Sequence, residues 1–268
     1  MSALPARLRA MLETALLSVK DEGQREDLRL VAGAIANATW QRWLSSRPPE
    51  DNRPEHEWVV FANIMKIAEA EQLTLSNRRI ATAFAFTHDT SYIPRIAEAM
   101  IRAADGERKQ QLEVDKKRQR TVHMKKGAAN AREILGQLKD PRGAGDPLLT
   151  DEEIERCADI VAGHDRWKLG QPHPLSTDLL AVVCLEGDAL WPLHPIGVLG
   201  DLERPDPLRD ACDPAAWREA LAHSLQTLRR YRANWNDLLH EHFIDHESIF
   251  RTQEGHRLYQ GWRKLWNL

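Results

Sequence analysis

Apolar residues recur at intervals of three and four positions along most of the chain, and strand-like alternation is scarce. Such intervals place apolar side chains on one face of an α-helix. Stretches rich in proline and glycine separate the periodic segments. The pattern therefore predicts an all-α protein, with helices at about residues 5–20, 24–45, 56–72, 76–93, 123–138, 150–164, 177–190, 215–242 and 253–266.

Local signals sharpen some of these boundaries. Thr150 and Glu153 form a capping-box pattern that predicts a helix start. Ser176 or Thr177 is expected to cap the helix that follows. Residues 107–126 are rich in basic side chains, and such runs are usually solvated helix faces. We expect this run to precede a separate helix that begins at His123.

The overall composition is that of an ordinary globular protein, with 42% hydrophobic and 29% charged residues. The net charge is −3 and the isoelectric point is about 6.4, which argues against a general nucleic-acid-binding surface. The amino-terminal residues lack a signal-peptide core, and polar residues interrupt every apolar run before it reaches bilayer length. We therefore expect a cytoplasmic protein with no membrane partner.

The three cysteines, Cys157, Cys184 and Cys212, are too far apart for a C-x-x-C zinc signature and are odd in number. Cys157 and Cys184 fall inside apolar helical patterns, which favours buried, small hydrophobic side chains. A reducing compartment fits this usage of cysteine.

Histidines and aspartates appear in a fixed order on separate helical segments. His88 and Asp188 follow apolar residues at four and eight positions, which places both on the buried side of their helices. A buried histidine is usually a hydrogen-bonded core residue, and this is the competing interpretation at each position taken alone. A repeated pattern favours a metal site, because imidazole and carboxylate are common ligands and a buried carboxylate is costly without a cation. The candidate metal ligands are His56, His88, Asp89, His123, His164 and Asp188.

This ordered set resembles the HD-domain superfamily of metal-dependent phosphohydrolases. Residues 83–89 (AFAFTHD) resemble the apolar lead into the His-Asp doublet of that family. Residues 123–128 (HMKKGA) resemble its third histidine with a small pair after it. Residues 160–165 (IVAGHD) and 179–190 (LLAVVCLEGDAL) resemble its fourth histidine and its final aspartate helix. The likeness spans about residues 54–195.

The resemblance implies an HD-like helical bundle and a binuclear centre. His56, His88, Asp89 and Asp188 would hold a first metal ion. His123 and His164 would bind a second ion that is bridged by Asp89, so that the catalytic roles fall to Asp89, His123 and His164. The two divalent ions would be iron, manganese or another transition metal. We expect one domain over 1–268, with the core at 54–195, the amino-terminal helices at 5–45 and the carboxyl-terminal helices at 215–266.

Binuclear members of the family often have a small residue and a lysine after the doublet, whereas this chain has Ser91 and Tyr92. Arg95, Lys125 and Lys126 are possible substitutes, and a solvated helix turn is the alternative for the two lysines. Arg251 precedes a predicted helix and could contact a substrate phosphate or carboxylate. The competing interpretation of Arg251 is a capped turn that packs the last helix.

Three further polar residues lie near the proposed site in sequence. His173 and His194 stand beside prolines in loops, where surface placement is favoured although either could reach the site. Asp165 forms a second His-Asp pair and is interpreted as a neighbour of the ligands or a surface residue.

The favoured function is hydrolysis of a phosphoester, a small phosphate or a nucleotide, at a binuclear metal centre. The alternative is a di-iron oxygenase of the same superfamily that cleaves a C–C or C–P bond with O₂. The ligand set is compatible with both. A non-catalytic regulatory module ranks third, because all six ligand positions are filled. The substrate is expected to be a small anionic molecule.

Overall fold

The structure is a computed structural model that describes residues 4–46, 55–91, 104–143, 145–169, 171, 173–197 and 250–265. Within these ranges the chain forms helices and contains no β-strand, apart from an isolated bridge between Lys139 and Pro147. The all-α prediction is confirmed. The division into one domain with a core at 54–195 stays a prediction.

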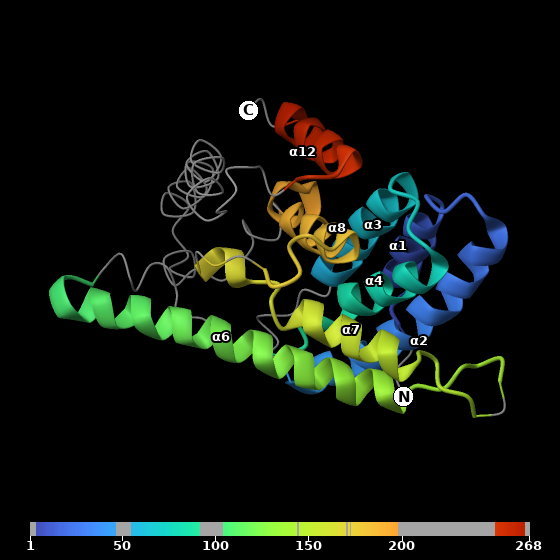
Figure 1. Ribbon diagram of the computed structural model, residues 1–268, viewed down its shortest axis with the longest axis horizontal. Helices are drawn as coiled ribbons and strands as arrows, with labels where there is room; N and C mark the ends of the chain where they lie inside the picture. The colour runs from blue at the N-terminus through green and yellow to red at the C-terminus, as the bar shows by residue number, and fades with distance from the viewer. Residues whose placement is uncertain are drawn as a thin grey trace.

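The helices follow one another in the order that the apolar periodicity predicts (Figure 1). They are α1 (Ala6–Leu16), α2 (Glu22–Ser46), α3 (Glu55–Ala70), α4 (Leu75–Thr87), α6 (Gly106–Gln137), α7 (Asp151–Val161), η2 (Arg166–Leu169), α8 (Leu179–Ala189), η3 (Trp191–Leu193) and α12 (Gln253–Leu265).

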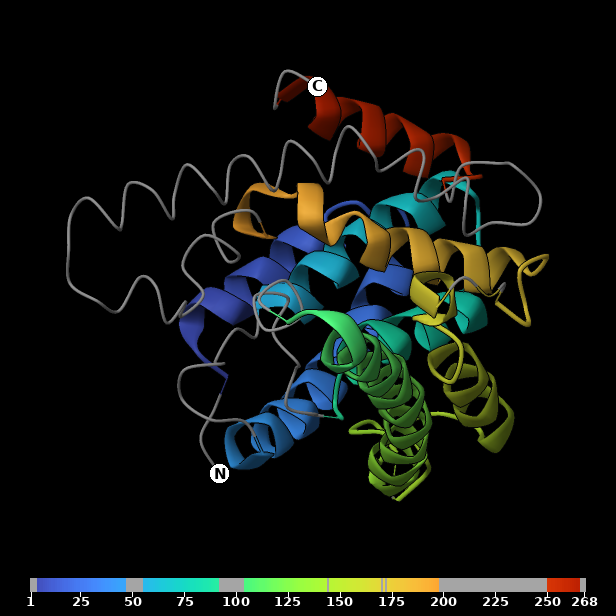
Figure 2. The same ribbon diagram turned by 90° about the vertical axis from the view of Figure 1, so that its left-hand side faces the viewer.

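Helices α3 and α4 together form the centre of the packing, since α3 contacts α1, α4 and α8. Helix α4 contacts α2 and α7 as well, and α7 packs along the carboxyl-terminal half of α6. Helix α12 lies across the outer side of α8 (Figure 2). The buried apolar side chains of these helices form one contiguous core.

Helix α6 differs from its sequence-based prediction. The charged run and the segment that begins at His123 form one continuous helix of 32 residues, Gly106–Gln137. The prediction of a separate helix starting at His123 is therefore wrong, because no proline or glycine interrupts the run between Glu107 and His123. The amino-terminal half of α6 extends away from the other helices (Figure 1), and its charged residues are mostly exposed.

Two helix caps test the local predictions. The Thr150–Glu153 capping box is present, since the Thr150 hydroxyl accepts from the Glu153 amide at 3.2 Å and the Glu153 carboxylate accepts from the Thr150 amide at 3.0 Å. Helix α8 is capped by Asp178, which accepts from the Ala181 amide at 3.1 Å, and not by Ser176 or Thr177.

Several predictions fall on residues outside the described ranges, namely the helix at 215–242, Cys212 and Arg95. Cys157 and Cys184 are buried as predicted, and burial raises the pKa of the Cys157 thiol to about 12. In the part of the chain that the structure describes, no helix combines the length and apolar character needed to cross a membrane.

Candidate metal centre

The fold brings the six predicted ligands together from five helical segments. His56 lies in the first turn of α3, His88 caps the end of α4, and Asp89 follows it directly. His123 lies in the middle of α6, His164 in the turn after α7, and Asp188 near the end of α8. They form two groups of three, His56–His88–Asp188 and Asp89–His123–His164. Within each group the ligand atoms lie within 4.8 Å of one another.

Carboxylate oxygens lie at the centre of each group. In the first, Oδ1 of Asp188 lies 2.9 Å from Nε2 of His56 and 3.6 Å from Nε2 of His88. In the second, Oδ1 of Asp89 lies 2.9 Å from Nε2 of His123 and 3.6 Å from Nε2 of His164.

Asp89 also connects the two groups. Its second oxygen, Oδ2, lies 3.3 Å from Nδ1 of His56. One carboxylate therefore faces a histidine of the first group with one oxygen and two histidines of the second group with the other. The Oδ2 contact is with Nδ1 of His56, whereas Asp188 faces Nε2 of the same ring.

Backbone carbonyls fix the orientation of three of the imidazoles. Nδ1 of His88 donates to the carbonyls of Phe84 and Ala85 at 3.2 and 3.1 Å. Nδ1 of His123 donates to Ser91 at 2.8 Å, and Nδ1 of His164 donates to Val161 at 2.7 Å. Because carbonyls only accept, these bonds place a proton on Nδ1 and leave Nε2 facing the carboxylates. Metal-binding histidines usually show such a bond on the far nitrogen.

The environment of His88 tests whether a cation fits. Nε2 of His88 is buried and has no hydrogen-bond partner in the part of the chain that the structure describes. A buried polar atom without a partner costs free energy. The atom points at the Asp188 carboxylate from 3.6 Å, a separation that a cation between the two could bridge. Four imidazole nitrogens with two carboxylates are a donor set that suits iron, manganese or zinc.

The electrostatics of the centre favour positive charge. Burial lowers the pKa of His56, but the hydrogen bonds and charges of Asp188 and Asp89 outweigh it and raise the pKa to about 10. The pKa values of His88 and His123 are raised in the same way against their burial. Burial raises the pKa of Asp89, but the surrounding imidazoles hold it well below its usual range. The carboxylates thus attract protons to the imidazoles when no metal ion is present.

A glycine allows α6 to approach the doublet closely. A Cβ atom on Gly127 would lie 3.0 Å from the carbonyl oxygen of His88 and 3.2 Å from Cγ1 of Val161. Gly127 lies one helical turn after His123, so this close contact sets the distance of His123 from Asp89. On the other side of the centre, the ring of Trp191 stacks on His56 with centroids 4.9 Å apart.

The centre is closed on one side and open on another. The side chains of His88 and His164 are at most 1% exposed. Those of His56, Asp89 and His123 are 18%, 15% and 17% exposed. The part of the centre that solvent reaches is therefore formed by Asp89, His56 and His123.

The predicted substrate-binding residues receive less support. Lys125 and Lys126 are exposed on α6. Nη1 of Arg251 donates to the carbonyl of Ser176 at 2.7 Å, and the Arg251 amide donates to the buried carboxylate of Glu186. These contacts fit the capped turn that was the competing interpretation of Arg251.

Two neighbouring histidines contact other parts of the protein and not the six candidate ligands in the part of the chain that the structure describes. His173 is buried, which makes its predicted surface placement wrong, because Nε2 donates to Ile160 at 3.1 Å and Nδ1 accepts from the Leu175 amide. His194 is partly buried against Trp262, and burial lowers its pKa to about 4.

Sequence reasoning missed two buried carboxylate contacts. Asp165 is buried and accepts from Arg120 at 2.6 Å, so it is a neighbour of the ligands and not a surface residue. Glu186 is buried on α8 and accepts from the amide and the hydroxyl of Thr252. The sequence signal for Glu186 is a charged residue in a helix that, apart from Asp188, carries no other charge.

No protein-family model, curated protein or solved structure matches this chain. The resemblance to the HD-domain superfamily therefore rests on the order of its own residues and on their positions in the fold.

Proposed function

We propose that this protein is a metal-dependent hydrolase of a phosphoester, with a binuclear centre of the HD-domain type. The observation that carries the proposal is the position of Asp89. Its two oxygens face the His56 group and the His123 group separately. A shared carboxylate between two ligand sets is the feature that a two-metal hydrolase needs.

The assignment of ligands follows from the two groups. His56, His88 and Asp188 would hold one ion, His123 and His164 the other, and Asp89 would contribute to both. Two divalent ions supply the positive charge that polarises a phosphoester and activates a water for hydrolysis. The protein contributes the Nδ1–carbonyl bonds that orient the imidazoles and the buried wall around His88 and His164.

A di-iron oxygenase is the second candidate. Four of the six ligands are imidazoles, a donor set that suits iron as well as manganese or zinc. This candidate uses the same residues and differs in the metal and in the co-substrate.

The experiment that separates the two begins with purification without oxygen and measurement of bound metals. Phosphate release from p-nitrophenyl phosphate and from nucleotides, and O₂ uptake with small phosphonates and polyols, are then measured in parallel. The hydrolase proposal predicts phosphate release that depends on the bound metal, with loss of activity in Asp89→Asn. Two irons with O₂ uptake and no phosphate release would contradict it and favour the oxygenase.

A further inference from the structure

Arg120 lies on α6 one helical turn before His123. Side chains three positions apart on a helix are neighbours, and helical side chains lean toward the amino terminus. The ring of His123 therefore leans toward the turn that carries Arg120. Since the His123 side chain is 17% exposed, Arg120 lies beside a candidate ligand that solvent partly reaches.

An ion pair fixes the guanidinium in this position. Nη1 of Arg120 lies 2.6 Å from Oδ2 of Asp165, and Asp165 follows the ligand His164 directly in sequence. The Asp165 side chain is buried, so it offers a fixed attachment point. Arg120 thus lies one helical turn from His123 and pairs with the residue that follows His164. His123 and His164 belong to the same group.

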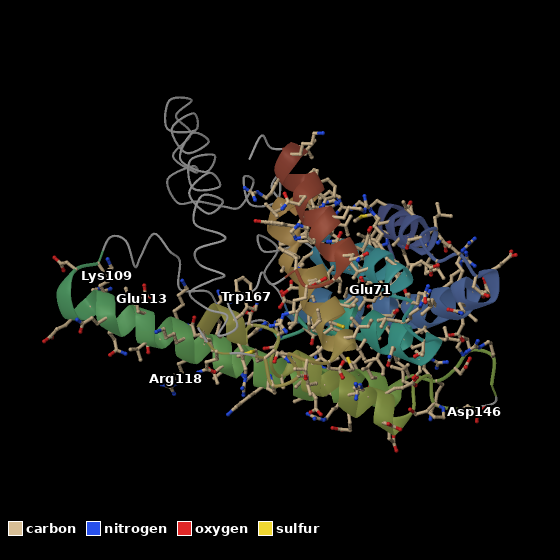
Figure 3. The ribbon with its side chains drawn as sticks, turned by 45° about the horizontal axis from the view of Figure 1, so that its top comes forward. Glu71, Lys109, Glu113, Arg118, Asp146 and Trp167 are labelled. Carbon is tan, nitrogen blue, oxygen red and sulfur yellow. The ribbon has the colours of Figure 1, made fainter. Side chains whose placement is uncertain are left out.

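The guanidinium retains unused donors. It has five N–H bonds in a planar fork, and the pair with Asp165 is its one hydrogen bond within the part of the chain that the structure describes. The side chain is 30% exposed, so a ligand can reach it. Arg118, two residues earlier, points away from the other helices in Figure 3 and has no such relation to the centre.

We infer that Arg120 binds the phosphoryl group of the substrate at the Asp89–His123–His164 side of the centre. This inference rests on the proposed function and names the residue that recognises the negative charge of the substrate. A guanidinium matches a phosphate because two parallel N–H groups can meet two oxygens. Asp165 orients the fork while the remaining N–H groups bind the ligand.

The test measures the binding of inorganic phosphate to the Mn²⁺-loaded protein by titration calorimetry, so that it does not depend on turnover. Arg120→Met is expected to weaken phosphate binding about tenfold or more, the loss of one charge-assisted hydrogen bond. The Mn²⁺ content should equal that of the wild type. Arg118→Met removes the same charge from the same helix, and its phosphate affinity is expected to stay within about twofold of the wild type.

Equal phosphate affinity of Arg120→Met and wild type, at equal metal content, would overturn the inference and leave the proposed function intact. A tenfold loss of phosphate affinity in Arg118→Met would overturn the inference too. The affinity would then depend on the total positive charge of α6 and not on Arg120 itself. A wild-type protein that takes up no metal, or that takes up metal and binds no phosphate, would overturn both.

Arg120→Gln covers the case in which Arg120→Met fails to load metal. Its amide can still donate to Asp165, but it has no charge. With normal metal content it should show the same loss of phosphate affinity, and wild-type affinity would contradict the inference. If it also loses the metal, Arg120 supports the structure of the centre and the inference is wrong.

Discussion

Asp89 and His123 are separated by 34 positions in the chain, yet Oδ1 of Asp89 lies 2.9 Å from Nε2 of His123. The same carboxylate lies 3.3 Å from Nδ1 of His56 through its other oxygen. Three helical segments, α3, the end of α4 and the middle of α6, therefore meet at one side chain. The proposed function depends on this meeting point.

The approach of α6 to α4 depends on Gly127. Replacement by alanine places a methyl group about 3 Å from the His88 carbonyl and from Val161, so α6 or these neighbours must shift by a few tenths of an ångström. We expect Gly127→Ala to lower the free energy of unfolding by about 1–3 kcal/mol, as for overpacking elsewhere. It should also weaken metal binding at the His123 group, which isothermal titration would detect.

Gly136 on the same helix provides the matched control. Nothing lies within 4 Å of a Cβ atom at that position. Gly136→Ala should therefore raise stability by up to about 1 kcal/mol through helix propensity alone. If both variants behave alike in chemical denaturation, the close contact at Gly127 does not position α6.

Metal uptake should release protons at neutral pH. Although burial lowers the pKa of His56, Asp188 and Asp89 raise it to about 10, so this imidazole carries a proton in the metal-free protein at pH 7. A metal ion binds only the neutral ring, so the apparent affinity should rise with pH until that pKa is passed. Calorimetry in buffers of different ionisation enthalpy counts the protons. The His56→Ala variant should release fewer protons than the wild type when it binds metal. An equal number of protons released by the two proteins would contradict the role of His56 as a ligand.

Glu186 should make stability depend on pH. Burial raises its pKa to about 7, although hydrogen bonds from Thr252 and Arg251 oppose this. Because the folded pKa lies above the ordinary glutamate value of 4.5, the contribution of this carboxyl to stability is fully present below about pH 4.5 and is lost as the pH rises through 7. We expect metal-free wild type to lose about 1–3 kcal/mol between pH 5 and pH 8 relative to Glu186→Gln.

The comparison with Glu186→Gln isolates one group, because glutamine is neutral throughout and every other titrating residue is shared. Its amide can still accept from the Thr252 backbone and meet the Thr252 hydroxyl. Parallel pH profiles of unfolding free energy for the two proteins would show that Glu186 ionises normally in the fold.

The ligands could be predicted from the sequence because each lies on or beside an apolar helical pattern. His88 and Asp188 follow apolar residues at helical spacing, and the Thr150–Glu153 cap fixes the start of the helix that leads to His164. Such signals are local, and local periodicity determines which face of a helix is buried.

Contacts between distant segments could not be predicted in this way. The sequence does not show that α6 continues through His123. A charged run has the same pattern whether it ends before the next helix or is part of that helix. The pair of Arg120 with Asp165 spans 45 positions, and the bonds of Glu186 to Thr252 span 66. His173 is buried because its ring bridges Ile160 and Leu175, a contact that its loop sequence does not reveal.

The central claim is that these six residues hold two metal ions, and the metal content of purified protein tests it most directly. Elemental analysis after reconstitution should give two ions per wild-type chain and one per chain of His123→Ala, with the helical content unchanged. His256→Ala, which replaces an exposed histidine on α12, should keep two. A wild-type content below two, or a His123→Ala protein that still binds two, would contradict the binuclear centre.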